Sequence, residues 1–254
     1  MDRVIRLTRE VGFQEEKYRS FYLSIRWSNK QLMELLNLRV RKLISRIYTK
    51  GQVSYQDVFP EHVGKTSVDD YLGKMTLNRP RDILEFLNYC IEASLDNPEI
   101  SMAAIKKAEA KYSESRFRSL ADEWYGDYPQ LLNYASYFLK GRPTFFLAQD
   151  ITDEQIQNLC LEIAVNLDAR SDLLYGKARE VAELKIKPEI FRSEILNIFY
   201  KVGLIGIKTS NLTSVAWSFR DEGLIIRSSE INEGSKIHLC PVFYRVLNIS
   251  ERVL

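Results

Sequence analysis

The spacing of apolar residues changes at Gly203, and this change constrains the fold more than any other feature of the sequence. Before Gly203, apolar side chains recur three and four residues apart, the period of an α-helix that buries one face. After it, the chain carries short β-prone runs separated by Gly, Asn and Asp, at residues 204–208, 214–220, 223–228 and 236–240. The sequence therefore predicts a mainly α chain, with a helical domain followed by a winged-helix-like α+β domain.

Helix starts can be placed from capping residues and first-turn prolines. Two capping boxes occur, Ser28 with Gln31 and Thr152 with Gln155. The other predicted starts are Ser67, Pro80, Ser101 and Pro188. Met102 is expected to face inward in the helix after Ser101. Further helices are predicted at 113–125, 129–139 and 171–185.

Gly141-Arg142-Pro143 is the best linker candidate. It divides the chain into a helical domain at 1–142 and a second part at 143–254, which is a helical linker plus a winged-helix-like domain whose wing is Asn232-Glu233-Gly234. Residues 1–27 are expected to be an extended segment leading into the first domain.

Charge and hydropathy exclude several classes of protein. The chain has 254 residues, 36 Lys and Arg against 34 Asp and Glu, so no overall field attracts nucleic acid or a membrane. Residues 1–50 are basic, with 12 Lys/Arg against 5 Asp/Glu. No run of about 18 apolar residues is present, and the N-terminus lacks the apolar core of a signal peptide. We expect a cytoplasmic protein without a membrane partner.

The sequence contains few residues that could form a cofactor or metal site. Cys90, Cys160 and Cys240 lie far apart in apolar surroundings and are expected to be buried thiols, and with two His there is little material for a metal site. Gly64-Lys65-Thr66 resembles the Gly-Lys-Ser/Thr end of a phosphate-binding P-loop motif. Position 59 is Phe where the full motif needs Gly, so no cofactor site is predicted on this chain.

Arg79-Pro80-Arg81-Asp82 is the most informative polar motif. Two guanidiniums flank a helix start whose dipole is already positive, and an external anion such as a phosphate would explain them. In the alternative, Asp82 offsets the helix terminus and the arginines pair with carboxylates elsewhere. Spacing alone favours this second interpretation.

Two further sets of charged residues are candidates. Glu114, Asp122, Glu123 and Asp127 lie close in sequence, but adjacent helical positions project about 100° apart, so a solvated helix face is the better interpretation. In the C-terminal domain, the predicted phosphate contacts are Lys201, Lys208, Arg220 and Arg227. A winged helix that binds protein, or only packs, is at least as well supported.

Several of these segments together resemble the lid region of bacterial P-loop ATPases of the STAND and KAP type. The resemblance rests on Ile25-Arg26-Trp27-Ser28, Val58-Phe59-Pro60, Thr76 to Asn88 with its Arg-Pro-Arg-Asp, Tyr128-Pro129, Phe199 to Ile207, and Pro241-Val242-Phe243. It implies that Arg81, and second Arg79, senses nucleotide when ATP and Mg²⁺ are bound by a partner core. It also implies links with phage defence and DNA transactions.

We therefore expect a non-catalytic regulatory fragment that couples nucleotide state to a protein or DNA partner. Its partners would be a P-loop ATPase core or further copies of the chain. A free-standing winged-helix DNA-binding protein is the main alternative, and a hydrolase built on the Glu114–Asp127 carboxylates is a third.

Overall fold

A computed structural model describes residues 27–45, 51, 53–95, 97, 99–220 and 225–250. The predicted extended segment 1–27 therefore lies outside the described residues except for Trp27, which packs half-buried against the core. The chain is mainly helical with small antiparallel sheets, as predicted. No helix within these ranges is both long enough and apolar enough to cross a membrane.

The first helices begin where their capping residues predict. Helix α3 (Asn29–Ser45) follows Ser28, whose Oγ accepts from the Gln31 backbone N–H at 3.2 Å while Gln31 Oε1 accepts from the Ser28 N–H at 2.9 Å. Helix α4 (Val68–Met75) is capped by Ser67, and α5 (Pro80–Ala93) has its proline in the first turn. A small hairpin precedes α4, formed by β1 (His62–Val63) and β2 (Thr66–Ser67).

Helix α6 (Met102–Trp124) corrects two predictions. It runs without a break, so residues 113–125 do not form a separate helix. Met102 is exposed rather than inward-facing. Ser113, where the separate helix was expected to begin, is a serine in the middle of α6. Here it lies inside the helix and is fully buried, and its Oγ accepts from the Val246 backbone N–H at 3.1 Å.

The C-terminal part alternates helices with the strands of a second sheet. Its elements are α7 (Leu131–Leu139), β3 (Phe145–Leu147), α8 (Asp153–Val165), α9 (Tyr175–Ala182), α10 (Pro188–Lys201), β4 (Ile205–Lys208) and β5 (Lys236–Leu239). The capping box of Thr152 and Gln155 starts α8 as predicted. The helix predicted at 171–185 is shorter: α9 runs only from Tyr175 to Ala182, after a 3₁₀ turn at Leu167–Ser171.

The second sheet is antiparallel, with β5 between β3 and β4. Strand β3 was not predicted from the sequence. The run at 214–220 contributes only one bridge, in which Ala216 pairs with Ile207. Residues 221–224 lie outside the described residues, and 225–228 form no strand. The predicted wing is a tight turn before β5, in which the Ser235 N–H donates to the Asn232 carbonyl at 3.0 Å.

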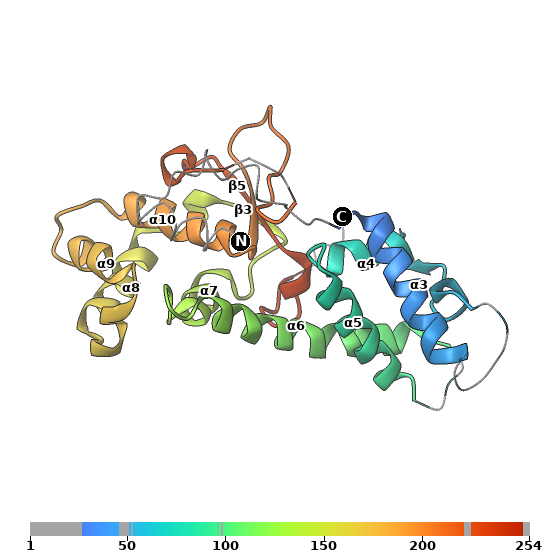
Figure 1. Cartoon of the computed structure of the whole chain (residues 1–254). Coiled ribbons are helices and arrows are strands. Elements are labelled where there is room, and N and C mark those ends of the chain that lie inside the picture. The colour runs from blue at the N-terminus through green and yellow to red at the C-terminus, as the bar shows by residue number, and fades with distance from the viewer. Residues whose placement is uncertain are drawn as a thin grey trace, which may run out of the picture.

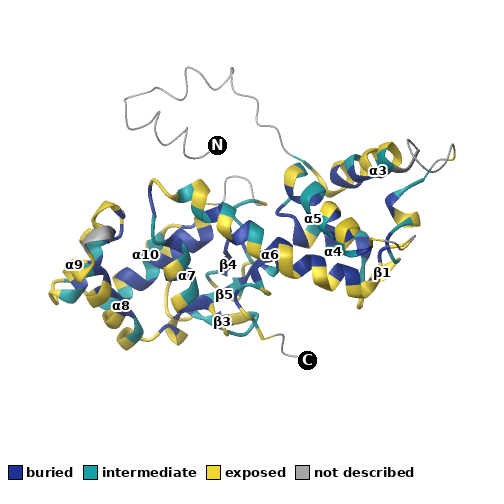
Figure 2. Ribbon diagram, turned by 90° about the horizontal axis from the view of Figure 1, so that it is seen from below, coloured by how far each residue is buried: buried dark blue, intermediate teal, exposed yellow. Residues whose placement is uncertain are grey.

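Helix α6 connects the two ends of the molecule. Figure 1 shows α3, α4 and α5 at one end, α8 and α9 at the other, and the second sheet between them. Buried residues form a continuous cluster through both parts, and Figure 2 shows the buried colour on helices of both parts. The C-terminal 3₁₀ turn Pro241–Phe243 packs on α6 and α4. The boundary proposed at residue 142 stays a prediction, and contacts cross it.

Candidate functional site

The turn between α4 and α5 fixes the position of the Arg-Pro-Arg-Asp motif. Leu77 and Asn78 adopt left-handed backbone angles, with φ of 41° and 53°. Thr76 Oγ1 donates to the Leu72 carbonyl at 2.8 Å, and the Arg79 backbone N–H donates to the Thr76 carbonyl at 2.9 Å. Arg79 is then the extended residue before the helix, and Pro80 supplies the preset φ of its first turn.

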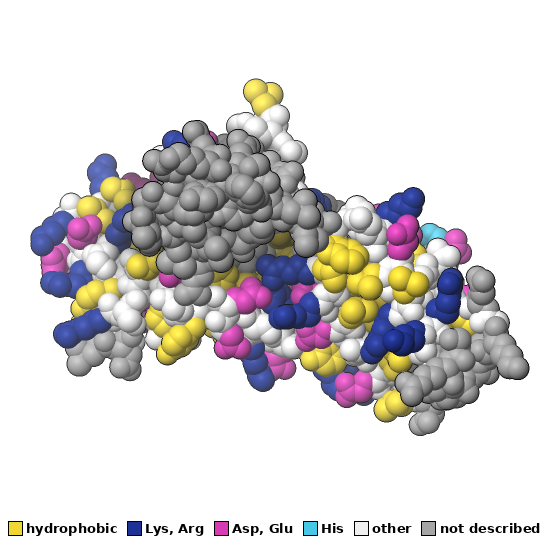
Figure 3. All heavy atoms as spheres, in the orientation of Figure 1, with side chains coloured by type: hydrophobic (Ala, Val, Ile, Leu, Met, Phe, Trp, Pro, Cys, Tyr) yellow, Lys and Arg dark blue, Asp and Glu magenta, His cyan; other side chains and the backbone are white. Residues whose placement is uncertain are grey.

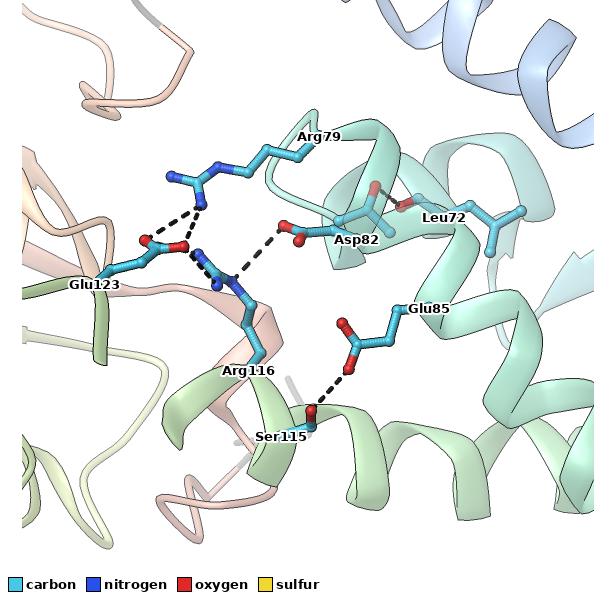
Figure 4. A network of polar contacts seen from close by, with 8 residues as sticks. Leu72, Arg79, Asp82, Glu85, Ser115, Arg116 and Glu123 are labelled. Atoms are coloured by element: carbon cyan, nitrogen blue, oxygen red, sulfur yellow. Dashed lines mark hydrogen bonds and ion pairs between the residues drawn. The ribbon is translucent and has the colours of Figure 1, made fainter. Parts of the chain in front are cut away.

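Glu123 of α6 receives two arginines from different helices (Figure 4). Arg79 Nη1 lies 3.2 Å from Glu123 Oε1. Arg116 donates through Nη1 to Oε1 at 3.1 Å and through Nη2 to Oε2 at 3.4 Å. For Arg79, the structure therefore agrees with the second interpretation, in which the arginines of the motif pair with carboxylates elsewhere in the chain. Glu123 ties the start of α5 to α6.

Asp82 and Arg116 form the buried side of this network, being 1% and 3% exposed. Arg116 Nε lies 3.7 Å from Asp82 Oδ2, too far for a hydrogen bond. These two atoms and the Tyr112 hydroxyl find no hydrogen-bond partner among the described residues. Because Arg116 directs its hydrogen bonds to Glu123, the Asp82 carboxylate is poorly compensated.

The pKa values follow from this geometry. Burial raises the pKa of Asp82 to about 6, against the opposing charges of Arg116 and Arg79. Burial also acts to raise the pKa of Glu123, but the hydrogen bonds and charges of Arg116 and Arg79 outweigh it and lower that pKa. The Arg116 pKa is raised, because its carboxylate contacts overcome the effect of burial.

Arg81, the preferred sensor residue from the sequence, lies outside this network. Its side chain is exposed in the first turn of α5, and no hydrogen bond or ion pair holds it within the described ranges. The face of the molecule in Figure 3 mixes both signs of charge, with no wide area of one sign among the coloured side chains. Arg79 is therefore held by an ion pair with Glu123, whereas the Arg81 side chain is exposed to solvent.

The remaining acidic candidates do not come together. Glu114 is exposed and pairs with Arg118 one helical turn away at 2.5 Å, while Asp122 is exposed. Asp127 is buried after α6, where its backbone carbonyl accepts from the Leu173 N–H at 3.1 Å. The described residues contain no group of three His, Cys, Asp or Glu side chains arranged to hold a metal ion.

Sequence reasoning missed Glu109, a buried carboxylate on α6. It accepts hydrogen bonds from the Tyr71 hydroxyl at 2.5 Å, Lys106 Nζ at 2.7 Å and Arg245 Nη2 at 2.9 Å. A signal was present, because Glu109 and Arg116 lie on the same helical stripe as Ile105, Ala108 and Tyr112. A charged residue on an apolar stripe indicates a buried ion pair.

The four predicted phosphate contacts of the C-terminal part are spread over several elements. Lys201 is exposed at the end of α10, Lys208 is half-buried on β4, and Arg220 and Arg227 are exposed in the connection between β4 and β5. Helix α10, which precedes β4, buries Phe191, Arg192 and all of 195–200. It is therefore a packing helix along most of its length.

Two further expectations have clear structural outcomes. Gly64 and Lys65 form the turn of the β1–β2 hairpin, with Gly64 at φ 66°, and Thr66 begins β2. Cys90, Cys160 and Cys240 are buried free thiols, as predicted.

One comparison with known proteins gives a match. Residues 30–121 match the family model described as the FunZ-associated C-terminal helical domain. The match runs from α3 into α6 and includes Arg79, Arg81, Asp82 and Arg116. Neither the curated proteins nor the solved structures contain a match to the chain.

Proposed function

We propose that the chain is a non-catalytic helical module that docks on the nucleotide-binding core of a P-loop ATPase, carried by another chain or another segment. The arrangement of Arg79 and Arg81 at the start of α5 carries this proposal. Arg81 meets the partner's phosphate or an acidic group beside it, and the Glu123–Arg116 network holds the helix start in place.

The physical basis is the cost of placing cations at a helix N-terminus. The backbone dipole makes that end positive, so an arginine there is unfavourable until an anion approaches. Asp82 supplies the only acidic side chain of the first turn, and it is buried against Arg116. An exposed Arg81 guanidinium can hold a phosphate through two hydrogen bonds.

The family match supports a modular role. Its description names a helical domain at the C-terminus of an associated protein, and its residues include both arginines. The resemblance to STAND and KAP ATPases supplies the identity of the proposed core. Both the family match and the resemblance include the start of α5 with its two arginines.

Pyrophosphate binding and ATP hydrolysis test the proposal. We expect the purified chain to hydrolyse no ATP and to bind pyrophosphate weakly by calorimetry at low salt. Arg81→Ala should weaken that binding about tenfold, as expected for the loss of one charge-assisted contact. Arg118→Ala, which removes an exposed guanidinium from α6, is the matched control and should leave it unchanged.

Two results would contradict the proposal. ATP hydrolysis by the chain alone, abolished by Arg81→Ala, would show an enzyme. Equal pyrophosphate affinity in Arg81→Ala and Arg118→Ala would remove the site at α5.

Duplex DNA binding by the winged-helix-like part is the second candidate function. It is favoured by the sheet that follows α10 and by exposed Lys201, Arg220 and Arg227. The burial of α10 counts against its acting as a recognition helix in the major groove of DNA. A mobility shift on duplex DNA that weakens steeply with salt supports it, and no shift at low salt contradicts it.

A further inference from the structure

The β3–β5–β4 sheet has one face in the core and one face turned outward. Along β5, Ile237 and Leu239 are buried while Lys236 and His238 are half-buried, which is the alternation of a one-sided sheet. The strand register places Phe145 and Gly206 opposite His238, and Lys208 opposite Lys236. We call the set Phe145, Lys208, Lys236 and His238 the outer sheet face.

Two lysines face each other across this sheet. Lys208 of β4 is the register partner of Lys236 of β5, and like charges directly opposite destabilise a strand pair. Neither lysine forms an ion pair with any described residue. Burial, followed by the charges of these two lysines, lowers the pKa of His238, so its imidazole is neutral at pH 7. The face therefore places two lysines side by side without an ion pair to any carboxylate of the described residues.

Aromatic rings lie beside the two lysines. The rings of Phe145 and His238 stack with centroids 5.6 Å apart and 24° between their planes, and Phe145 is 47% exposed. Gly206 lets Trp217 approach the sheet closely, because a Cβ added there would lie 2.7 Å from the indole ring. The exposed part of the Phe145 ring is therefore available for stacking.

We propose that the outer sheet face binds single-stranded nucleic acid, with Lys208 and Lys236 contacting phosphates and Phe145 stacking on a base. Flat sheets that combine lysines with exposed aromatic rings bind strands whose bases are unstacked and accessible. A duplex hides its base faces, and α10 is too buried to enter a groove. This inference is independent of the site at α5.

Fluorescence anisotropy with a labelled oligothymidylate tests the proposal on the full chain. We expect binding at low salt, with log K falling against log salt with a slope of about −1.4, as two neutralised phosphates predict. Phe145→Ala should weaken binding about tenfold through lost stacking. Lys236→Glu should weaken it at least as much, while its melting temperature stays equal or rises because it now faces Lys208 with opposite charge.

Lys107→Glu is the matched control, because it makes the same charge change on an exposed lysine of α6 outside the outer sheet face. It should change the affinity less than about twofold, since an exposed charge far from the ligand is screened by salt. The proposal is overturned if wild type does not bind, or if Lys107→Glu and Lys236→Glu weaken binding equally. Equal affinity for duplex DNA and for the oligothymidylate also overturns it. Displacement of the oligothymidylate by thymidine monophosphate at a comparable concentration does so as well.

Discussion

Glu109 of α6 binds Arg245, which lies 136 positions later in the chain, at 3.1 Å from Nε and 2.9 Å from Nη2. The neighbouring Val246 N–H donates to Ser113 Oγ one turn along the same helix. One helix therefore presents Glu109 and Ser113 to the C-terminal segment and Arg116 and Glu123 to α5. Helix α6 holds together parts of the chain that the sequence places in different domains.

Replacing Glu109 should weaken the whole fold. Its side chain is 7% exposed, so Glu109→Ala leaves the Tyr71 hydroxyl and the Arg245 guanidinium without their acceptor. We expect a loss of about 3 kcal/mol in the free energy of unfolding, measured with urea. Arg245→Ala should cost about 1 kcal/mol, because the Arg245 side chain is half-exposed. Glu114→Ala on the exposed face of α6 serves as the control. An equal loss of unfolding free energy in Glu114→Ala would contradict the stabilising role of Glu109.

Asp82 should give the fold a measurable pH dependence. Its pKa in the folded state is about 6, above its ordinary value of 3.8, so the folded protein binds its proton more tightly than the unfolded chain does. The stability from that proton is present below pH 3.8 and is lost as the pH rises through about 6. A shift of roughly two units corresponds to about 3 kcal/mol. Asp82→Asn should remove this slope in urea titrations, and parallel curves for variant and wild type would contradict the prediction.

Gly206 should be intolerant of a side chain. A Cβ there would lie 2.7 Å from the Trp217 ring and 2.8 Å from Val215 Cγ1. We expect Gly206→Ala to cost about 1–3 kcal/mol, measured as a lower melting temperature. Gly176 of α9 has no atom within 4 Å of the equivalent position, so Gly176→Ala should be neutral or stabilise by up to about 1 kcal/mol. Equal effects at the two glycines would count against this packing.

The three cysteines should react only when the protein opens. Burial raises the pKa of Cys90, Cys160 and Cys240 to about 12, so the reactive thiolate is scarce at pH 8. We expect a disulfide reagent to label all three at the rate of unfolding, and urea to accelerate the labelling. Fast labelling of any one thiol in the native protein would show a local opening at that cysteine.

Local chemistry explains which elements could be predicted. The capping boxes of Ser28 and Thr152 and the prolines at 80 and 188 act within one helical turn, so their helices start where the sequence predicts. The helix predicted to begin at residue 113 was wrong, because α6 runs through Ser113 without a break. The Ser113 hydroxyl accepts from the Val246 backbone N–H, a contact between residues far apart in the sequence.

Strand β3 and the arginine motif show what sequence patterns omit. Phe145–Leu147 is too short for its alternation to be recognised, and it becomes a strand by pairing with β5. At α5, the sequence placed Arg79 and Arg81 at the helix start. The preference for Arg81 over Arg79 as the nucleotide sensor came only from the resemblance to ATPase lids. The tether of Arg79 to Glu123 depends on how α5 packs on α6.

The sequence by itself determined that the chain is mainly helical and that helices begin after Ser28, Ser67 and Thr152 and at Pro80 and Pro188. Caps, prolines and hydrophobic period act between residues a few positions apart. Only the tertiary structure decided which charges are buried and what they contact. Asp82 with Arg116, Glu109 with Arg245, and Lys208 opposite Lys236 meet because separate elements pack together. Coulomb and desolvation energies depend on that distance and burial, which no local pattern encodes.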